Sequence, residues 1–131
     1  MVILASEDIG NANPNALNLA TSTLLATKNI GYPEASIILS QCVVYLASSP
    51  KSNSSYVAIK KALEYVKKNR PLRILDNLKS PKSKGYLYPH DYGGWVKQRY
   101  LEKDIKLYSP NEVGFEKRLS EWISKVKKKD Y

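Results

Sequence analysis

The eleven residues Ile37-Ile38-Leu39-Ser40-Gln41-Cys42-Val43-Val44-Tyr45-Leu46-Ala47 decide the fold class of this 131-residue chain. Only Ser40 and Gln41 interrupt the apolar run, and Pro33-Glu34 before it and Pro50 after it mark the ends of a helix. A helix that is apolar on nearly all sides must be buried on nearly all sides. It is either the centre of a monomeric core or an interface between copies of the chain, and the residues alone leave both possibilities open. Its candidate interface residues are Ile37, Ile38, Val43, Val44 and Tyr45.

Helical patterns surround this run on both sides. Asn13-Pro14 predicts a helix start, with Asn as the cap, and Gly31 suits the end of that helix. A third helix is predicted from Ser52 or Asn53 to about Lys68, and a last one from about Gly114 to Lys127. Because the first three connections are short, we expect an all-α fold built as an antiparallel helical array.

Residues 70–111 break the helical pattern with prolines and glycines but remain rich in tyrosine. Large apolar anchors of this kind are lacking in disordered segments. We therefore expect an ordered, aromatic-rich extended strap between the third helix and the C-terminal helix. The last helix should turn one apolar face to the core and expose the remainder, with Phe115, Leu119, Trp122, Ile123 and Val126 on the apolar face.

The net charge of +9 is unevenly distributed. Residues 51–90 hold ten Lys and Arg against two acidic residues, whereas residues 1–50 are slightly acidic. Such asymmetry indicates either a polyanionic partner or a lysine-rich solvated surface. The candidate DNA-facing residues are Lys51, Lys60, Lys61, Lys67 and Lys68. Nearby tyrosines either stack on bases or fix the strap to the core.

The sequence argues against several classes of site. One cysteine, Cys42, and one histidine, His90, cannot supply the ligands of a zinc site, and there is no phosphate-binding Gly-x-x-x-x-Gly-Lys-Ser/Thr run. His90-Asp91 and Glu7-Asp8 are the remaining candidates for catalysis, and structural roles are favoured for both pairs. We expect no catalytic residue, cofactor site or metal site in this chain, and no membrane span.

Short motifs occur along nearly the whole chain, in the segments 5–10, 13–17, 31–35, 49–54, 84–86, 88–91, 95–96 and 114–118. In this order they resemble the C-terminal domain of the replication-associated recombination protein A family, also called the Mgs or Werner-helicase-interacting AAA+ ATPases. The family-motif residues are Glu7, Asp8, Gly10, Pro14, Pro33, Lys51, Asn53, Tyr88, Pro89, His90 and Asp91.

This resemblance implies that residues 1–131 are a single helical domain that follows an ATPase module, and the uncapped apolar start at Val2-Ile3-Leu4 agrees with a helix that begins upstream. It further implies that the domain assembles the protein into tetramers, and that ATP and Mg bind to the upstream module. DNA and single-stranded-DNA-binding protein would be partners of the full-length protein, in the cytoplasm near the nucleoid. The alternative function is an autonomous basic module that binds single-stranded nucleic acid.

Overall fold

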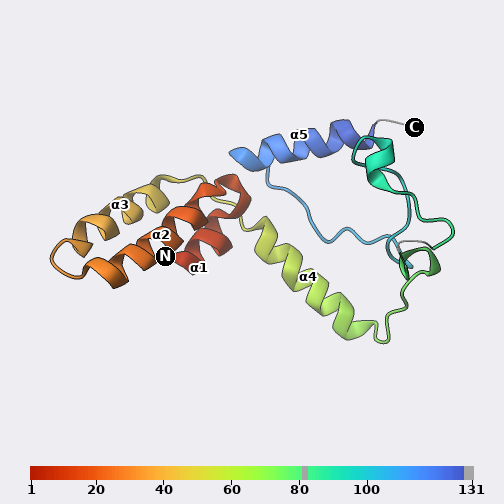
Figure 1. Cartoon of the computed structure of the whole chain (residues 1–131), viewed down its shortest axis with the longest axis horizontal. Helices are drawn as coiled ribbons and strands as arrows, with labels where there is room; N and C mark the ends of the chain where they lie inside the picture. Colours follow the sequence, from red (N-terminus) through yellow and green to blue (C-terminus); the bar gives the residue numbers. More distant parts are fainter. Residues whose placement is uncertain (81–82, 129–131) are drawn as a thin grey trace.

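Small side chains allow two long helices to pack closely in the computed structural model, which describes residues 1–80 and 83–128. Helix α2 (Asn15–Ile30) buries Ala16, Ala20 and Thr23 against α3 (Ala35–Ser48), which contributes Cys42 and Leu46 to the same core. Figure 1 shows the two helices side by side, joined by a short turn. Alanines four residues apart leave space for the larger side chains of the facing helix.

The N-terminal segment closes one side of this pair. It consists of one short α-helical turn, α1 (Val2–Leu4), a π-helical turn, η1 (Ala5–Ile9), and a 3-10 turn, η2 (Gly10–Ala12). Ala5 and Ile9 are completely buried against the core residues of α2 and α3. These turns form the platform from which the rest of the chain departs.

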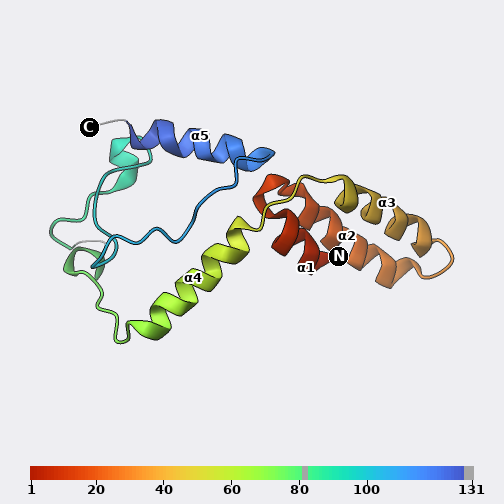
Figure 2. The ribbon, with the colours of Figure 1, turned by 180° about the vertical axis from the view of Figure 1, so that it is seen from behind.

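Helix α4 (Ser54–Lys68) leaves this platform instead of folding back along α2 and α3 (Figures 1 and 2). It contacts mainly η1 and η2. The amide of Ser52 donates to the carbonyl of Asp8 (2.8 Å), and this hydrogen bond fixes where α4 begins. The third helix is thus formed as predicted, but the predicted antiparallel helical array is not confirmed.

Residues 69–114 are mostly extended and contain two 3-10 turns, η3 (Asp76–Leu78) and η4 (Pro89–Tyr92). Helix α5 (Phe115–Lys127) follows, and its N-terminal end contacts η2 (Figure 1). The described residues contain helices and no strand, so the all-α class is confirmed. An aromatic strap lying on the helices is not confirmed, since Tyr88 and Tyr100 are half exposed.

Two local predictions are corrected. Asn13 does not cap α2; its amide donates instead to the hydroxyls of Tyr45 (3.0 Å) and Ser49 (3.1 Å), which ties the start of α2 to the end of α3. In α5, Phe115 and Trp122 are exposed, while Glu116 is completely buried. The cause is the network of hydroxyl donors that surrounds the Glu116 carboxylate.

Candidate functional site

A buried carboxylate joins the beginning of α5 to the region between α3 and α4, which is more than sixty residues away in the sequence. Glu116, in the first turn of α5, accepts hydrogen bonds from the hydroxyls of Ser52, Ser54 and Tyr108. Asn111 donates to the Ser52 hydroxyl (3.1 Å) and adds a further contact to the same cluster. We call these five residues the polar junction. It ties the α3–α4 link and the segment before α5 to the start of α5.

The Glu116 carboxylate remains ionised although it is buried, because hydrogen-bond donors surround it. Burial alone raises the pKa of this carboxyl group, but the hydroxyls of Ser52, Ser54 and Tyr108 and a backbone hydrogen bond from Asn111 outweigh burial and lower the pKa. Burial, followed by the neighbouring carboxylate, raises the pKa of the Tyr108 phenol. The junction therefore holds an ionised carboxylate surrounded by neutral donors. Because Glu116 is completely buried, no substrate can reach it, and the junction serves to hold the start of α5 against the α3–α4 link.

The ammonium group of Lys51 also has a structural role. It donates to the carbonyls of Leu46 (2.8 Å), Ala47 (3.3 Å) and Ser49 (2.5 Å), at the C-terminal end of α3. These are carbonyls that a helix end leaves without intrahelical partners, at the negative end of its dipole. Lys51 is thus engaged at the end of α3, and we leave it out of the DNA-facing surface proposed below.

Replacing Lys51 with methionine is expected to lower the free energy of unfolding by about 1 kcal/mol, since it removes charge-assisted hydrogen bonds at a helix end while keeping most of the apolar stem. Denaturant unfolding followed by circular dichroism would measure the change. Lys61→Met on α4 is the matched control and should shift the midpoint much less.

Four of the five candidate DNA-facing lysines, all except Lys51, lie on the exposed polar face of α4. Lys60 donates to the Tyr56 hydroxyl (3.1 Å), and this hydrogen bond raises the pKa of the lysine. Lys68 pairs with Glu64 (2.5 Å), which lowers the pKa of that carboxyl group. Both interactions run within one helix face, so Lys60, Lys61, Lys67 and Lys68 form a basic strip along α4.

The candidate interface residues of α3 divide into two groups. Ile37, Val43 and Val44 are 72%, 53% and 62% exposed, so the described part of the chain leaves more than half of each side chain uncovered. Ile38 is half buried. Tyr45 packs against the core, and its hydroxyl receives hydrogen bonds from Asn13 and Asn15, which lower its phenol pKa.

The candidate catalytic pairs lie apart from one another. His90 and Asp91 sit on η4, where the imidazole ring contacts the Tyr88 ring at 5.0 Å between centroids. Glu7 and Asp8 belong to η1. The backbone carbonyl of Asp8 accepts a hydrogen bond from the backbone amide of Ser52. Within residues 1–80 and 83–128, no group of three or more His, Cys, Asp or Glu side chains is placed to hold a metal ion.

The family-motif residues do not form one cluster. Three of them lie around the polar junction: Asp8, Gly10 and Asn53. Four others form a separate turn at η4, namely Tyr88, Pro89, His90 and Asp91, while Pro14 and Pro33 precede α2 and α3. Sequence reasoning missed Glu116, Ser52, Ser54 and Tyr108 as a unit. The available signal was weak: two serines spaced by one residue before a helix, and a glutamate directly after Phe115 in a first turn.

Among the described residues, no helix combines the length and apolar character that a membrane crossing requires.

The comparisons with known proteins agree on one family. The family model described as MgsA AAA+ ATPase C terminal matches residues 1–127. Replication-associated recombination protein A of Bacillus subtilis is 35% identical, over 98% of this chain and 34% of the relative. An uncharacterised protein of Thermotoga maritima is 44% identical, over 96% of this chain and 22% of the relative. ATPase WRNIP1 of Dictyostelium discoideum is 36% identical, over 92% of this chain and 14% of the relative.

The chain thus spans about a third or less of the length of these relatives. The matched region of the family model covers the α2–α3 pair, α4, the polar junction and all of α5. On this evidence the chain belongs to the family of MgsA AAA+ ATPase C-terminal domains.

Proposed function

We propose that this chain is the oligomer-forming domain, tetrameric in its complete form, of a DNA-dependent AAA+ ATPase that acts in replication, recombination and repair at stalled forks. One observation carries the proposal: the isolated chain exposes far more surface, and far more apolar surface, than a monomer of its mass needs to.

The excess of surface is large. The accessible surface is 9912 Å² for a mass of 14.8 kDa. A compact monomer of that mass exposes about 7,000 Å² by the usual scaling of surface with mass. The difference is about 2,900 Å² per chain, or about 5,800 Å² for two chains, which reaches the upper end of what permanent interfaces between two subunits bury. A second copy of the chain is therefore the occupant that fits, because obligate homomeric contacts resemble a core cut in half.

The apolar face of α3 supplies the centre of this interface. Ile37 and Val44 lie seven residues apart and so share one side of the helix, opposite Cys42 and Leu46 in the core. Val43 is also more than half exposed, but it lies about 100° around the helix from Val44 and so borders this face. Ile38 and Tyr45 pack within the chain and support this face without forming it.

The names of the relatives support the wider role. They include replication-associated recombination protein A and ATPase WRNIP1. In the full-length protein, the upstream module would bind ATP and Mg²⁺, and assembly through this domain would set the spacing of the ATPase modules on DNA. Single-stranded-DNA-binding protein would meet the assembled protein at forks, in the cytoplasm.

The assembly is tested on the chain itself. Light scattering coupled to size-exclusion chromatography, at several concentrations, should give a mass of about four chains. Replacing Ile37 and Val44 together with aspartate should shift the mass to that of one chain, because two carboxylates cannot be buried without partners. Ile74→Asp is the matched control: Ile74 is 64% exposed in the segment after α4, and its replacement should leave the mass unchanged.

A wild-type chain that stays monomeric at high concentration contradicts the proposal. If the Ile74→Asp variant dissociates as readily as the double variant, the interface lies elsewhere.

The second candidate function is binding of single-stranded nucleic acid, and the basic strip of α4 favours it. The exposed ammonium groups of Lys60, Lys61 and Lys67 are set along one helix face. Phosphate contacts of this kind do not depend on base sequence and weaken as salt rises. Replacing Lys60, Lys61, Lys67 and Lys68 together with alanine should abolish binding at low salt, as measured by fluorescence anisotropy of a labelled oligonucleotide.

A further inference from the structure

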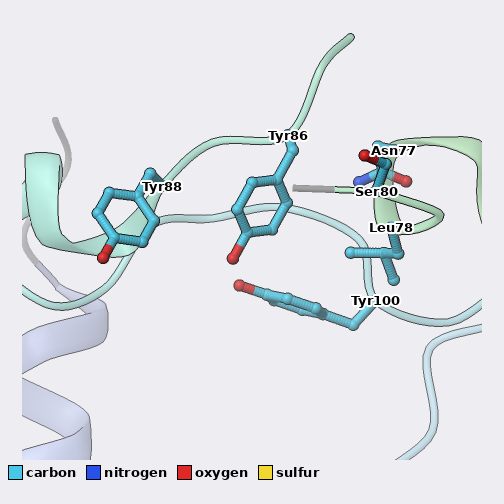
Figure 3. Close-up of a pocket in the computed structure, with 6 residues that line it drawn as sticks. All are labelled: Asn77, Leu78, Ser80, Tyr86, Tyr88 and Tyr100. Carbon is cyan, nitrogen blue, oxygen red and sulfur yellow. The ribbon is translucent and has the colours of Figure 1, made fainter. Parts of the chain in front are cut away.

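A tyrosine-lined pocket lies between η3 and the extended segments on either side of η4. Asn77, Leu78 and Ser80 form one wall, and Tyr86, Tyr88 and Tyr100 form the remainder, around a volume of about 640 Å³. Figure 3 shows the rings of Tyr86 and Tyr88 side by side, with the ring of Tyr100 across from them. The pocket is separate from the polar junction and from the exposed face of α3, and no role described above uses it.

The walls of the pocket are held in place within the chain. The side chain of Gln98 accepts from the amide of Leu87 (3.1 Å) and donates to its carbonyl (2.7 Å), as a neighbouring strand would. The same Gln98 amide group donates to the Tyr100 hydroxyl (2.8 Å), and the Tyr88 ring rests against His90. Aromatic rings fixed before a ligand arrives lose little freedom when it binds.

The rings are available to a ligand. Tyr88 and Tyr100 are 53% and 50% exposed, which is unusual for aromatic side chains that serve only as anchors. Leu78 adds an apolar floor, while the Asn77 amide and the tyrosine hydroxyls offer donors and acceptors. The pocket therefore suits a planar ring whose edge carries hydrogen-bonding groups.

The segment that builds the pocket is basic, although the residues that line the pocket are uncharged. Residues 70–106 hold nine Lys and Arg against four acidic residues. Asp76, the acidic residue next to Asn77, is paired with Lys79 (2.6 Å) and Arg73 (3.7 Å). A basic segment of this kind disfavours a cation, including a quaternary ammonium group, and favours a ligand with a phosphate backbone.

We propose that this pocket binds an unpaired base of single-stranded nucleic acid, with the base against Tyr86, Tyr88 and Tyr100, and that the net positive charge of residues 70–106 favours the phosphate backbone of the strand. The proposal rests on the second candidate function and adds to it the place where a base is bound. Paired bases are excluded because both of their faces are already stacked.

The test uses the whole 131-residue chain and three labelled probes in fluorescence anisotropy: a twelve-residue thymidine oligonucleotide, an abasic oligonucleotide of equal length and charge, and a duplex. The thymidine strand should bind tightest. Replacing both Tyr88 and Tyr100 with leucine should weaken its binding roughly 5- to 100-fold, in keeping with loss of stacking. The same variant should leave the weaker binding of the abasic strand unchanged.

Two further variants sharpen the result. Tyr100→Phe keeps the ring and should retain most of the affinity. Tyr32→Leu, at a side chain that is 75% exposed in the turn between α2 and α3, is the matched control and should bind like the wild type. Circular dichroism verifies that each variant is folded.

The outcomes separate the proposals. Equal binding of the thymidine and abasic strands overturns the base site but leaves phosphate binding by α4 standing. Binding of neither strand at low salt overturns both. If an acidic peptide with one tryptophan binds in a manner that needs Tyr88 and Tyr100, while the thymidine strand does not, the pocket takes a protein ligand and the base site is wrong. Light scattering on the same samples reports assembly independently.

Discussion

Replacing Gly114 with alanine is expected to lower the free energy of unfolding by about 3 kcal/mol or more, the largest effect of any single change considered. Gly114 precedes α5 with φ +57° and ψ −135°, a conformation that only glycine adopts readily. A Cβ atom at this position would lie 2.3 Å from the carbonyl oxygen of Ala12 and 3.0 Å from Cγ of Pro50. Since Ala12 contributes backbone, which cannot rotate away, α5 would be pushed off η2.

The matched control separates this clash from backbone strain. Gly31, after α2, has φ +77° and ψ 179°, but a Cβ atom there would meet nothing within 4 Å. Urea unfolding of both variants, at one protein concentration, measures the difference between strain alone and strain with a clash. Gly114→Ala should lose clearly more stability than Gly31→Ala. Equal losses would mean that the close approach of Gly114 to Ala12 does not exist in solution.

Local sequence signals located the helices but not their arrangement. The range predicted for the third helix ends at Lys68, as observed for α4, because apolar spacing and a polar link mark a helix without reference to the rest of the chain. The direction of α4 depends on the hydrogen bond between the Ser52 amide and the Asp8 carbonyl, forty-four residues apart. Nothing in a short window of sequence predicts such a contact.

The polar junction eluded prediction for a similar reason. A glutamate in the first turn of a helix is ordinarily explained by the helix dipole and solvent, so the sequence predicts Glu116 outside the apolar face of the last helix, among its exposed residues. Its burial depends on Ser52, Ser54 and Tyr108, which come from other segments. By contrast, the exposure of Ile37 and Val44 is one of the two outcomes that the apolar run leaves open, because such a helix can be buried either within one chain or between copies.

The Glu116→Gln variant is expected to lose about 2–3 kcal/mol of stability at pH 7, because charged acceptors make the stronger hydrogen bonds and the amide NH₂ group cannot accept from hydroxyls that now face it. Burial acts in the opposite direction, since the neutral amide is easier to bury than a carboxylate, and this keeps the loss below that of removing the side chain. Glu121→Gln, at an exposed position of the same helix, is the matched control and should have little effect.

The dependence of unfolding stability on pH separates the contribution of the Glu116 charge from that of the packing and hydrogen bonds that Gln would keep. Its folded-state pKa lies below the ordinary value of 4.5, so the ionised carboxylate stabilises the fold above that pH. As pH falls through the folded-state pKa, this stabilisation is lost. Urea midpoints from pH 7 to pH 3 should therefore fall more steeply for the wild type than for Glu116→Gln, and the two should converge at the acid end. Since Glu64 and Asp76 also have lowered pKa values, both proteins share their contribution, and only the difference between the curves belongs to Glu116. Parallel curves would show that the pKa of Glu116 does not change on folding, so that its charge adds no net stability. If the wild type gained stability relative to Glu116→Gln as pH falls, the junction would hold Glu116 in its neutral form.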